Sequence, residues 1–165
     1  MKKRFFFLFL SLFLFATSFA GCRQSAEAFD GFRQPFTAFV EGDLNGTGFS
    51  AEIKTEEAEQ GGVMPITVTF YAPEGLCGTI LRRLADGRAE MVVGATTLPL
   101  TANFSALFDL FPPTVKAEKV SLTAEGFTRV EAGGVAFFFL PDGTPYAVET
   151  PKGSIRVTRF TQTSL

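Results

Sequence analysis

The chain has 165 residues, with 15 basic and 17 acidic side chains, and 46% of its residues are hydrophobic. It contains no histidine, which excludes the commonest general base, the usual zinc ligand and every serine–histidine or cysteine–histidine nucleophile. The formal net charge is −2 and no basic stripe runs along the sequence, so nucleic-acid binding is disfavoured.

Residues 1–21 have the layout of a secretory signal peptide. Lys2, Lys3 and Arg4 form a positive start, and Phe5–Phe15 form a mainly apolar stretch before the small residues that follow. A membrane-spanning helix needs about 20 apolar residues. The stretch is therefore too short for a permanent transmembrane anchor, which is the alternative.

The signal ends in Phe19, Ala20, Gly21 and Cys22. This tetrapeptide resembles the lipobox of bacterial lipoproteins, in which an apolar residue and two small residues precede an obligatory cysteine. The resemblance implies cleavage between Gly21 and Cys22, a diacylglyceryl thioether on the Cys22 sulfur and an acyl chain such as palmitate on the new amino terminus. Two or three such chains hold a protein stably at a bilayer. We therefore expect a lipoprotein of the cell membrane, attached through the lipid on Cys22 and facing outside the cytoplasm.

The alternative for Cys22 is a disulfide with Cys77, the other cysteine of the chain. Lipidation would prevent that bond and leave Cys77 as a lone thiol, for which the expected role is a small buried hydrophobe. The mature body from Cys22 to the end keeps 12 basic and 17 acidic residues, so its formal charge is −5. Such a body is held at an anionic bilayer by lipid rather than by charge.

Residues 22–34 form the expected tether between the lipid and a single β domain at 35–165. Ala26, Phe29 and Phe32 follow one another at intervals of three, which places them near one face of a helical turn. Two phenylalanines in so short a segment predict a short helix that docks back on the domain.

From Pro35 onward, apolar and polar residues alternate with a period of two, which is typical of half-buried strands. Turn-forming sequences separate these segments, as in Asn45-Gly46, the ADG of 85–87, the PDGT of 141–144 and the PKG of 151–153. Turn signals every eight to twelve residues or so indicate an antiparallel meander of about ten strands. The expected strands cover residues 36–41, 47–54, 66–70, 76–83, 88–93, 119–124, 127–131, 135–140, 146–150 and 155–160.

Residues 103–111 break this rhythm. They read NFSALFDLF, with phenylalanine and leucine at the spacing of one helix face, and Pro112-Pro113 would end the helix. A single amphipathic helix inside a β meander is expected to lie across a sheet face or to plug an open barrel.

A meander with one mid-chain helix that ends in FFFLPDGTPYAVETPKGSIRVTRF resembles the half-barrel of the outer-membrane lipoprotein carrier family, over residues 36–160. Related lipid-binding lipoproteins and envelope-stress sensors share that half-barrel. The resemblance implies that the concave face and the helix enclose an apolar cavity for acyl chains. Its candidate lining residues are Phe49, Phe70, Phe104, Phe108, Phe137 and Phe139. The chain also resembles short lipoproteins of anaerobic Gram-positive bacteria, a likeness that implies no activity.

The alternative to a cavity is a fully packed core. Fourteen phenylalanines remain after residue 21, and aromatic side chains dominate core packing whether or not a ligand binds. The same residues would then simply fill the concave face.

The sequence contains no recognisable catalytic, metal or cofactor motif. Cys77 lies in GLCGT, but with no histidine in the chain it has no base to activate it. Glu56, Glu57 and Glu59 cluster in TEEAEQGG, where a solvated loop is expected and a weak cation site is the alternative. We therefore predict a non-catalytic protein without a cofactor or a metal.

Three hypotheses of function remain. We favour a tethered protein that binds a lipid or another hydrophobic ligand in the half-barrel, by analogy of fold. The alternative is an envelope protein–protein interaction module with a packed core and an apolar outer patch. A third hypothesis, a hydrolase built on carboxylates, requires two acidic residues that converge in a cleft.

Overall fold

The computed structural model describes residues 28–29, 32–58, 62–100 and 107–163. The expected signal peptide, Gly21, Cys22 and Phe104 lie outside these residues. Within the described ranges, no helix is both long and apolar enough to cross a membrane.

The described residues are mostly strands, with two short 3₁₀ helices, η1 (Glu74–Leu76) and η2 (Phe108–Leu110). The strands are β1 (Ala28–Phe29), β2 (Phe36–Leu44), β3 (Thr47–Thr55), β4 (Ile66–Ala72), β5 (Ile80–Arg83), β6 (Ala89–Val93), β7 (Thr96–Pro99), β8 (Val115–Lys116), β9 (Lys119–Leu122), β10 (Thr128–Ala132), β11 (Val135–Phe139), β12 (Pro145–Thr150) and β13 (Gly153–Gln162).

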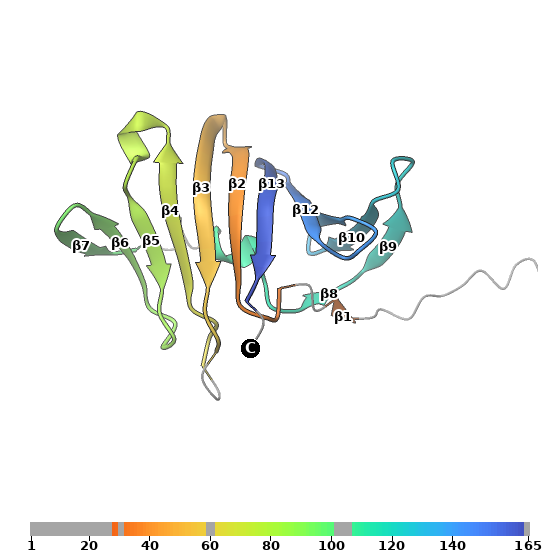
Figure 1. Cartoon of the computed structure of the whole chain (residues 1–165), viewed down its shortest axis with the longest axis horizontal. Helices are drawn as coiled ribbons and strands as arrows, with labels where there is room; N and C mark the ends of the chain where they lie inside the picture. The colour runs from red at the N-terminus through yellow and green to blue at the C-terminus, as the bar shows by residue number, and fades with distance from the viewer. Residues whose placement is uncertain (1–27, 30–31, 59–61, 101–106, 164–165) are drawn as a thin grey trace, which may run out of the picture.

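Eleven of these strands form one antiparallel sheet in the order β7-β6-β5-β4-β3-β2-β13-β12-β11-β10-β9 (Figure 1). Every neighbour in this order is also consecutive along the chain, except that β2 lies beside β13 in the middle. Two meanders, β2–β7 and β9–β13, are thus joined along one central ladder. The sheet stays open, with β7 and β9 at its edges. The prediction of an antiparallel β meander is confirmed.

Turn chemistry explains where the strands reverse. Asn45 and Gly46 have φ angles of 55° and 77°, which suit the two-residue hairpin between β2 and β3. Asp142 closes the turn between β11 and β12, where its Oδ1 accepts a hydrogen bond of 2.9 Å from the backbone N–H of Thr144. That bond lowers the pKa of the Asp142 carboxyl.

The two-residue strands β1 and β8 were not predicted, and two strands of the large sheet also differ from the prediction. The strand expected over 76–83 is shorter, because the chain first forms η1 and then turns at Gly78, whose φ is 78°. Strand β7 was not predicted at all. Gly94, with a φ of 57°, reverses the chain there, and the short TTLP sequence that follows is exposed throughout and has no alternation to reveal it.

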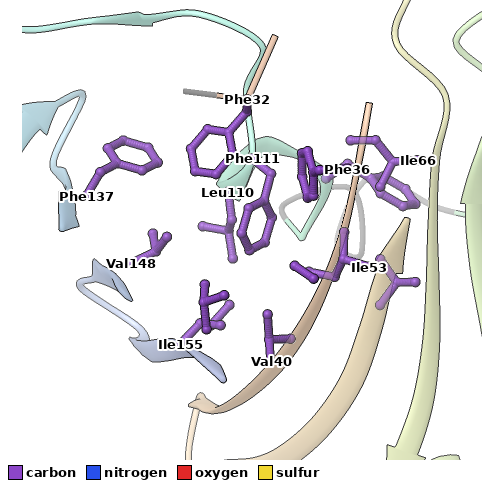
Figure 2. Packing of buried hydrophobic residues seen from close by; sticks show 14 of the residues in the cluster. Phe32, Phe36, Val40, Ile53, Ile66, Leu110, Phe111, Phe137, Val148 and Ile155 are labelled. Atoms are coloured by element: carbon purple, nitrogen blue, oxygen red, sulfur yellow. The ribbon is translucent and has the colours of Figure 1, made fainter. Parts of the chain in front are cut away.

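The concave face of the sheet carries the core because alternate side chains of each strand point to it. Ala38 and Val40 of β2 lie opposite Ile53 and Ala51 of β3, and all four are about 1% exposed or less. Figure 2 shows Val40 and Ile53 in one apolar cluster with Leu110 of η2, Val148 of β12 and Ile155 of β13. Full burial of one such aliphatic side chain contributes roughly 1.5–3 kcal/mol.

Phenylalanines fill the end of the sheet at which β2 begins and β13 ends. Phe32 is 1% exposed and touches four other rings (Figure 2). Its centroid lies 5.4 Å from that of Phe111, 5.7 Å from Phe36, 6.0 Å from Phe139 and 6.2 Å from Phe137. We call these five rings the phenylalanine cluster.

The two expected helices have other shapes in the described residues. In the tether, Ala28–Phe29 pair as strand β1 with β8 instead of forming a helical turn, although Phe32 does enter the core. The part of 103–111 that is described contains the 3₁₀ helix η2 rather than a longer α-helix. Its Phe108 and Leu110 are buried because the concave face supplies an apolar surface on that side.

Candidate ligand-binding site

A cavity of about 560 Å³ lies at the other end of the concave face, where β2 ends and β13 begins. Strands β3–β6 form one side of the cavity, and residues 107–110, which we call the η2 segment, form another. The β2–β3 turn, the β12–β13 turn and the chain between η1 and β5 border it. It is lined by Leu44, Asn45, Thr47, Phe49, Phe70, Leu76, Thr79, Leu81, Met91, Leu107, Asp109, Leu110, Val135, Thr150, Pro151 and Lys152.

The floor of the cavity consists of buried side chains from adjacent strands. Phe49 of β3 and Phe70 of β4 meet edge to face with ring centroids 5.9 Å apart. Leu81 of β5 is 2% exposed and lies opposite Met91 of β6. These residues alternate along each strand with outward-facing residues. Because every second side chain of a strand points to the same face, the apolar ones line the cavity together.

The rim is polar and exposed. Asn45 comes from the turn between β2 and β3, Thr47 begins β3, and Lys152 comes from the turn between β12 and β13. The two turns are tied together, since the backbone N–H of Asn45 donates a hydrogen bond of 2.7 Å to the carbonyl of Lys152. The cavity is therefore apolar at its floor and polar at its mouth.

Arg83 holds the η2 wall against β5. Its guanidinium lies 5.6 Å from the ring centroid of Phe108 and 3.7 Å from the carboxylate of Asp109. The side chain of Arg83 is only 16% exposed, whereas that of Asp109 is 73% exposed. Burial lowers the pKa of Arg83 from its ordinary value, and the charge of Asp109 partly offsets this.

The structure separates the phenylalanines proposed from sequence as cavity lining. Phe49 and Phe70 lie together on the cavity floor. Phe108 packs behind the η2 wall, while Phe137 and Phe139 belong to the phenylalanine cluster, and none of these three is part of the lining. Phe104, like Gly21 and Cys22, lies outside the described residues.

Several lining residues were missed by sequence reasoning. Leu81 and Met91 belong to strands that the alternation did predict, so extending the phenylalanine set to all inward-facing residues would have found them. The rim residues Asn45 and Lys152 lie in predicted turns, and Thr47 begins the strand predicted over 47–54. Finding them requires knowing that two distant hairpin turns meet at one end of the sheet, which follows only from the β2–β13 pairing.

Acidic side chains do meet at a second hollow of about 280 Å³, which is lined by Glu118, Glu131 and Glu149 together with Arg129, the ion-pair partner of Glu131. No metal site is found in the described part of the chain. Its residues contain no cluster of three or more histidine, cysteine or acidic side chains that could hold a metal ion. Cys77, expected to be buried, is exposed and free. Glu56 and Glu57 are exposed, as a solvated loop requires, and Glu59 lies outside the described ranges. What the described geometry offers is a hollow with an apolar floor.

No protein-family model matches the sequence, and no curated protein matches it. Several solved structures are similar to this chain, among them the following three. MucB, known from Pseudomonas aeruginosa, is 15% identical with a TM-score of 0.52, over 82% of this chain and 56% of MucB. A putative outer membrane lipoprotein-sorting protein domain from Vibrio parahaemolyticus is 9% identical, with a TM-score of 0.47 over 79% of this chain and 86% of the domain.

The third structure is a LolA superfamily protein from Nitrosomonas europaea, 6% identical with a TM-score of 0.46 over 83% of this chain and 91% of that protein. MucB has also been solved in complex with MucA(peri). The chain thus spans about half the length of MucB, with which it shares its open antiparallel fold.

Proposed function

We propose that this protein is a lipid-anchored lipoprotein outside the cytoplasm that holds a lipid or another hydrophobic ligand in the cavity, without catalysing a reaction. The observation that carries the proposal is the hollow itself. Its volume of about 560 Å³ falls within the range of about 300–1,000 Å³ typical of small-molecule sites. Its floor is made of buried phenylalanine and leucine side chains, which favour an apolar occupant.

The uneven filling of the concave face supports this proposal. The phenylalanine cluster closes one end, and the η2 segment packs against the middle. The end bordered by Leu44 and Lys152 stays open although apolar side chains are present there. A face that served only as a core would be packed to the density of protein interiors along its whole length.

The second candidate function is an envelope interaction module, and one observation favours it. Val93 of β6 and Leu98 of the edge strand β7 are 48% and 45% exposed, and both point to the same face of the sheet as the cavity-lining Met91. Exposed apolar side chains on an edge strand suit a protein partner. The solved complex of MucB with MucA(peri) is consistent with such a role for a protein of this fold.

Binding of a neutral fluorescent probe tests the cavity. We expect the body of residues 23–165, which keeps every described strand and core residue, to raise the fluorescence of N-phenylnaphthylamine. The variant Met91→Trp should abolish this rise, because the larger side chain occupies the hollow. Val92→Trp is the matched control, since residue 92 is next along β6 and points to the other face.

Circular dichroism would verify that both variants are folded. Failure of the unchanged body to bind the probe would contradict the ligand hypothesis and favour the interaction module. Full binding by folded Met91→Trp would show that the probe binds elsewhere.

A further inference from the structure

We infer that the cavity selects amphiphiles with an anionic head group, a carboxylate or a phosphate monoester, and that Lys152 is the residue that recognises it. The inference rests on the proposed function and adds the class of ligand. It begins from the distribution of polar groups along the cavity.

Most polar side chains of the described lining are exposed at its rim, although the buried Thr79 also belongs to the lining. Phe49, Phe70 and Leu81 at the floor are buried and offer no polar atom from their side chains. Asn45 and Lys152 at the rim are exposed. A wholly apolar ligand would leave this rim without a partner, whereas an amphiphile that enters tail first places its head group among the rim side chains.

The charges of the lining then decide the sign of the head group. Among the described lining residues, the charged side chains are those of Asp109 and Lys152. Asp109 lies 3.7 Å from the guanidinium of Arg83, so its charge is already matched. Lys152 forms no ion pair with any described residue. The unmatched charge at the cavity mouth is therefore the positive charge of Lys152. The rest of the mature body carries more acidic than basic side chains.

Backbone hydrogen bonds hold Lys152 in place. Its N–H donates to Thr150 Oγ1 over 3.1 Å, and its carbonyl accepts the 2.7 Å bond from Asn45. Thr150 Oγ1 also donates to the carbonyl of Gly153 over 3.1 Å. The turn is thus fixed before a ligand arrives, which lowers the entropy that binding must offset.

Displacement of bound N-phenylnaphthylamine by four dodecyl compounds tests the inference. Dodecanol, dodecanoate, dodecyl phosphate and dodecylamine share one chain and differ in head-group charge. We expect the two anions to bind about fivefold more tightly than the alcohol, as about 1 kcal/mol from one solvent-accessible ion pair allows. Dodecylamine should bind more weakly than the alcohol. Comparing dodecanoate with dodecyl phosphate shows which anionic head fits better.

Lys152→Met should remove the difference in affinity between the two anions and dodecanol. Lys152→Glu should reverse the order in favour of dodecylamine. Lys54→Met is the matched control, because Lys54 is also exposed but lies on β3 beside inward-facing Ile53 and points to the opposite face. This control should keep the preference for anions. Raising the ionic strength should reduce the preference in the unchanged protein.

Two failures can be told apart. Equal affinity for all four compounds, or a preference for anions that survives in Lys152→Met, would overturn the inference and leave the apolar cavity standing. Absence of binding by both the probe and dodecanol would overturn the proposed function as well.

Discussion

Gly153 shows how a single residue supports the cavity mouth. Its φ of 147° lies in a region that side chains rarely adopt, and an added Cβ would overlap the carbonyl oxygen of Asp43. Gly153→Ala should therefore lower the free energy of unfolding by about 2–4 kcal/mol. Urea titration measures this. Gly48→Ala is the control, because the Cβ there meets only ordinary contact distances, and an equal loss in both variants would contradict the explanation.

Two carboxylates in turns, those of Asp86 and Asp142, make the free energy of unfolding depend on pH. Backbone hydrogen bonds, from Arg88 to Asp86 and from Thr144 to Asp142, hold both pKa values below the ordinary 3.8. The folded state then binds fewer protons than the unfolded state, so the contribution is complete above pH 3.8 and disappears as the pH falls through the lowered pKa values.

Replacing Asp86 and Asp142 together by Asn keeps an acceptor oxygen but removes the titration. The free energy of unfolding, measured by urea titration from pH 5 to pH 2, should fall less steeply in this double variant than in the unchanged protein. Identical slopes would show that these turns do not contribute.

At the scale of elements, Phe32 ties the described part of the N-terminal segment to the core of the sheet. Phe32 contacts four other phenylalanines, whereas β1 pairs with β8 over only two residues. Phe32→Ala should lower the free energy of unfolding by about 3–5 kcal/mol, the usual effect of removing a buried phenylalanine. Leu122→Ala, at a position 75% exposed on edge strand β9, should change it by less than about 0.5 kcal/mol. A small effect of Phe32→Ala would mean that the segment is not part of the core.

Elements with a clear period were predictable, and those without one were not. Strands β2 and β3 follow from alternation together with the Asn45-Gly46 turn. Strand β7 has no alternation, and the helical spacing of Phe108 and Phe111 did not reveal that the described part of 103–111 contains the 3₁₀ helix η2. The sequence predicted part of the cavity floor, namely Phe49 and Phe70. It did not predict where on the concave face the cavity lies, because that depends on which part of the face the η2 segment covers.

At the scale of the whole molecule, the proposed membrane attachment depends on Cys22, which lies outside the described ranges. Cys22→Ser should leave the precursor uncleaved and without lipid, because the acyl-accepting sulfur is gone. Mass spectrometry of the cellular protein would then give the mass of the full 165-residue chain. Cys77→Ser, at the exposed free cysteine, is the control and should be processed normally. Normal lipidation of Cys22→Ser would contradict the lipobox interpretation.

The ladder between β2 and β13 also shapes how the chain reaches its fold. Arg156 and Glu41, which form an ion pair across this ladder, are 115 residues apart in sequence, whereas each meander is built from neighbouring hairpins. Closing so long a loop is entropically unfavourable, so the two wings can form early and their joining is the slow, high-contact-order step. Until β13 has been synthesised, β2 presents an unpaired edge with an apolar face beside it. A newly made chain is therefore most prone to aggregate in the interval before its last strand arrives.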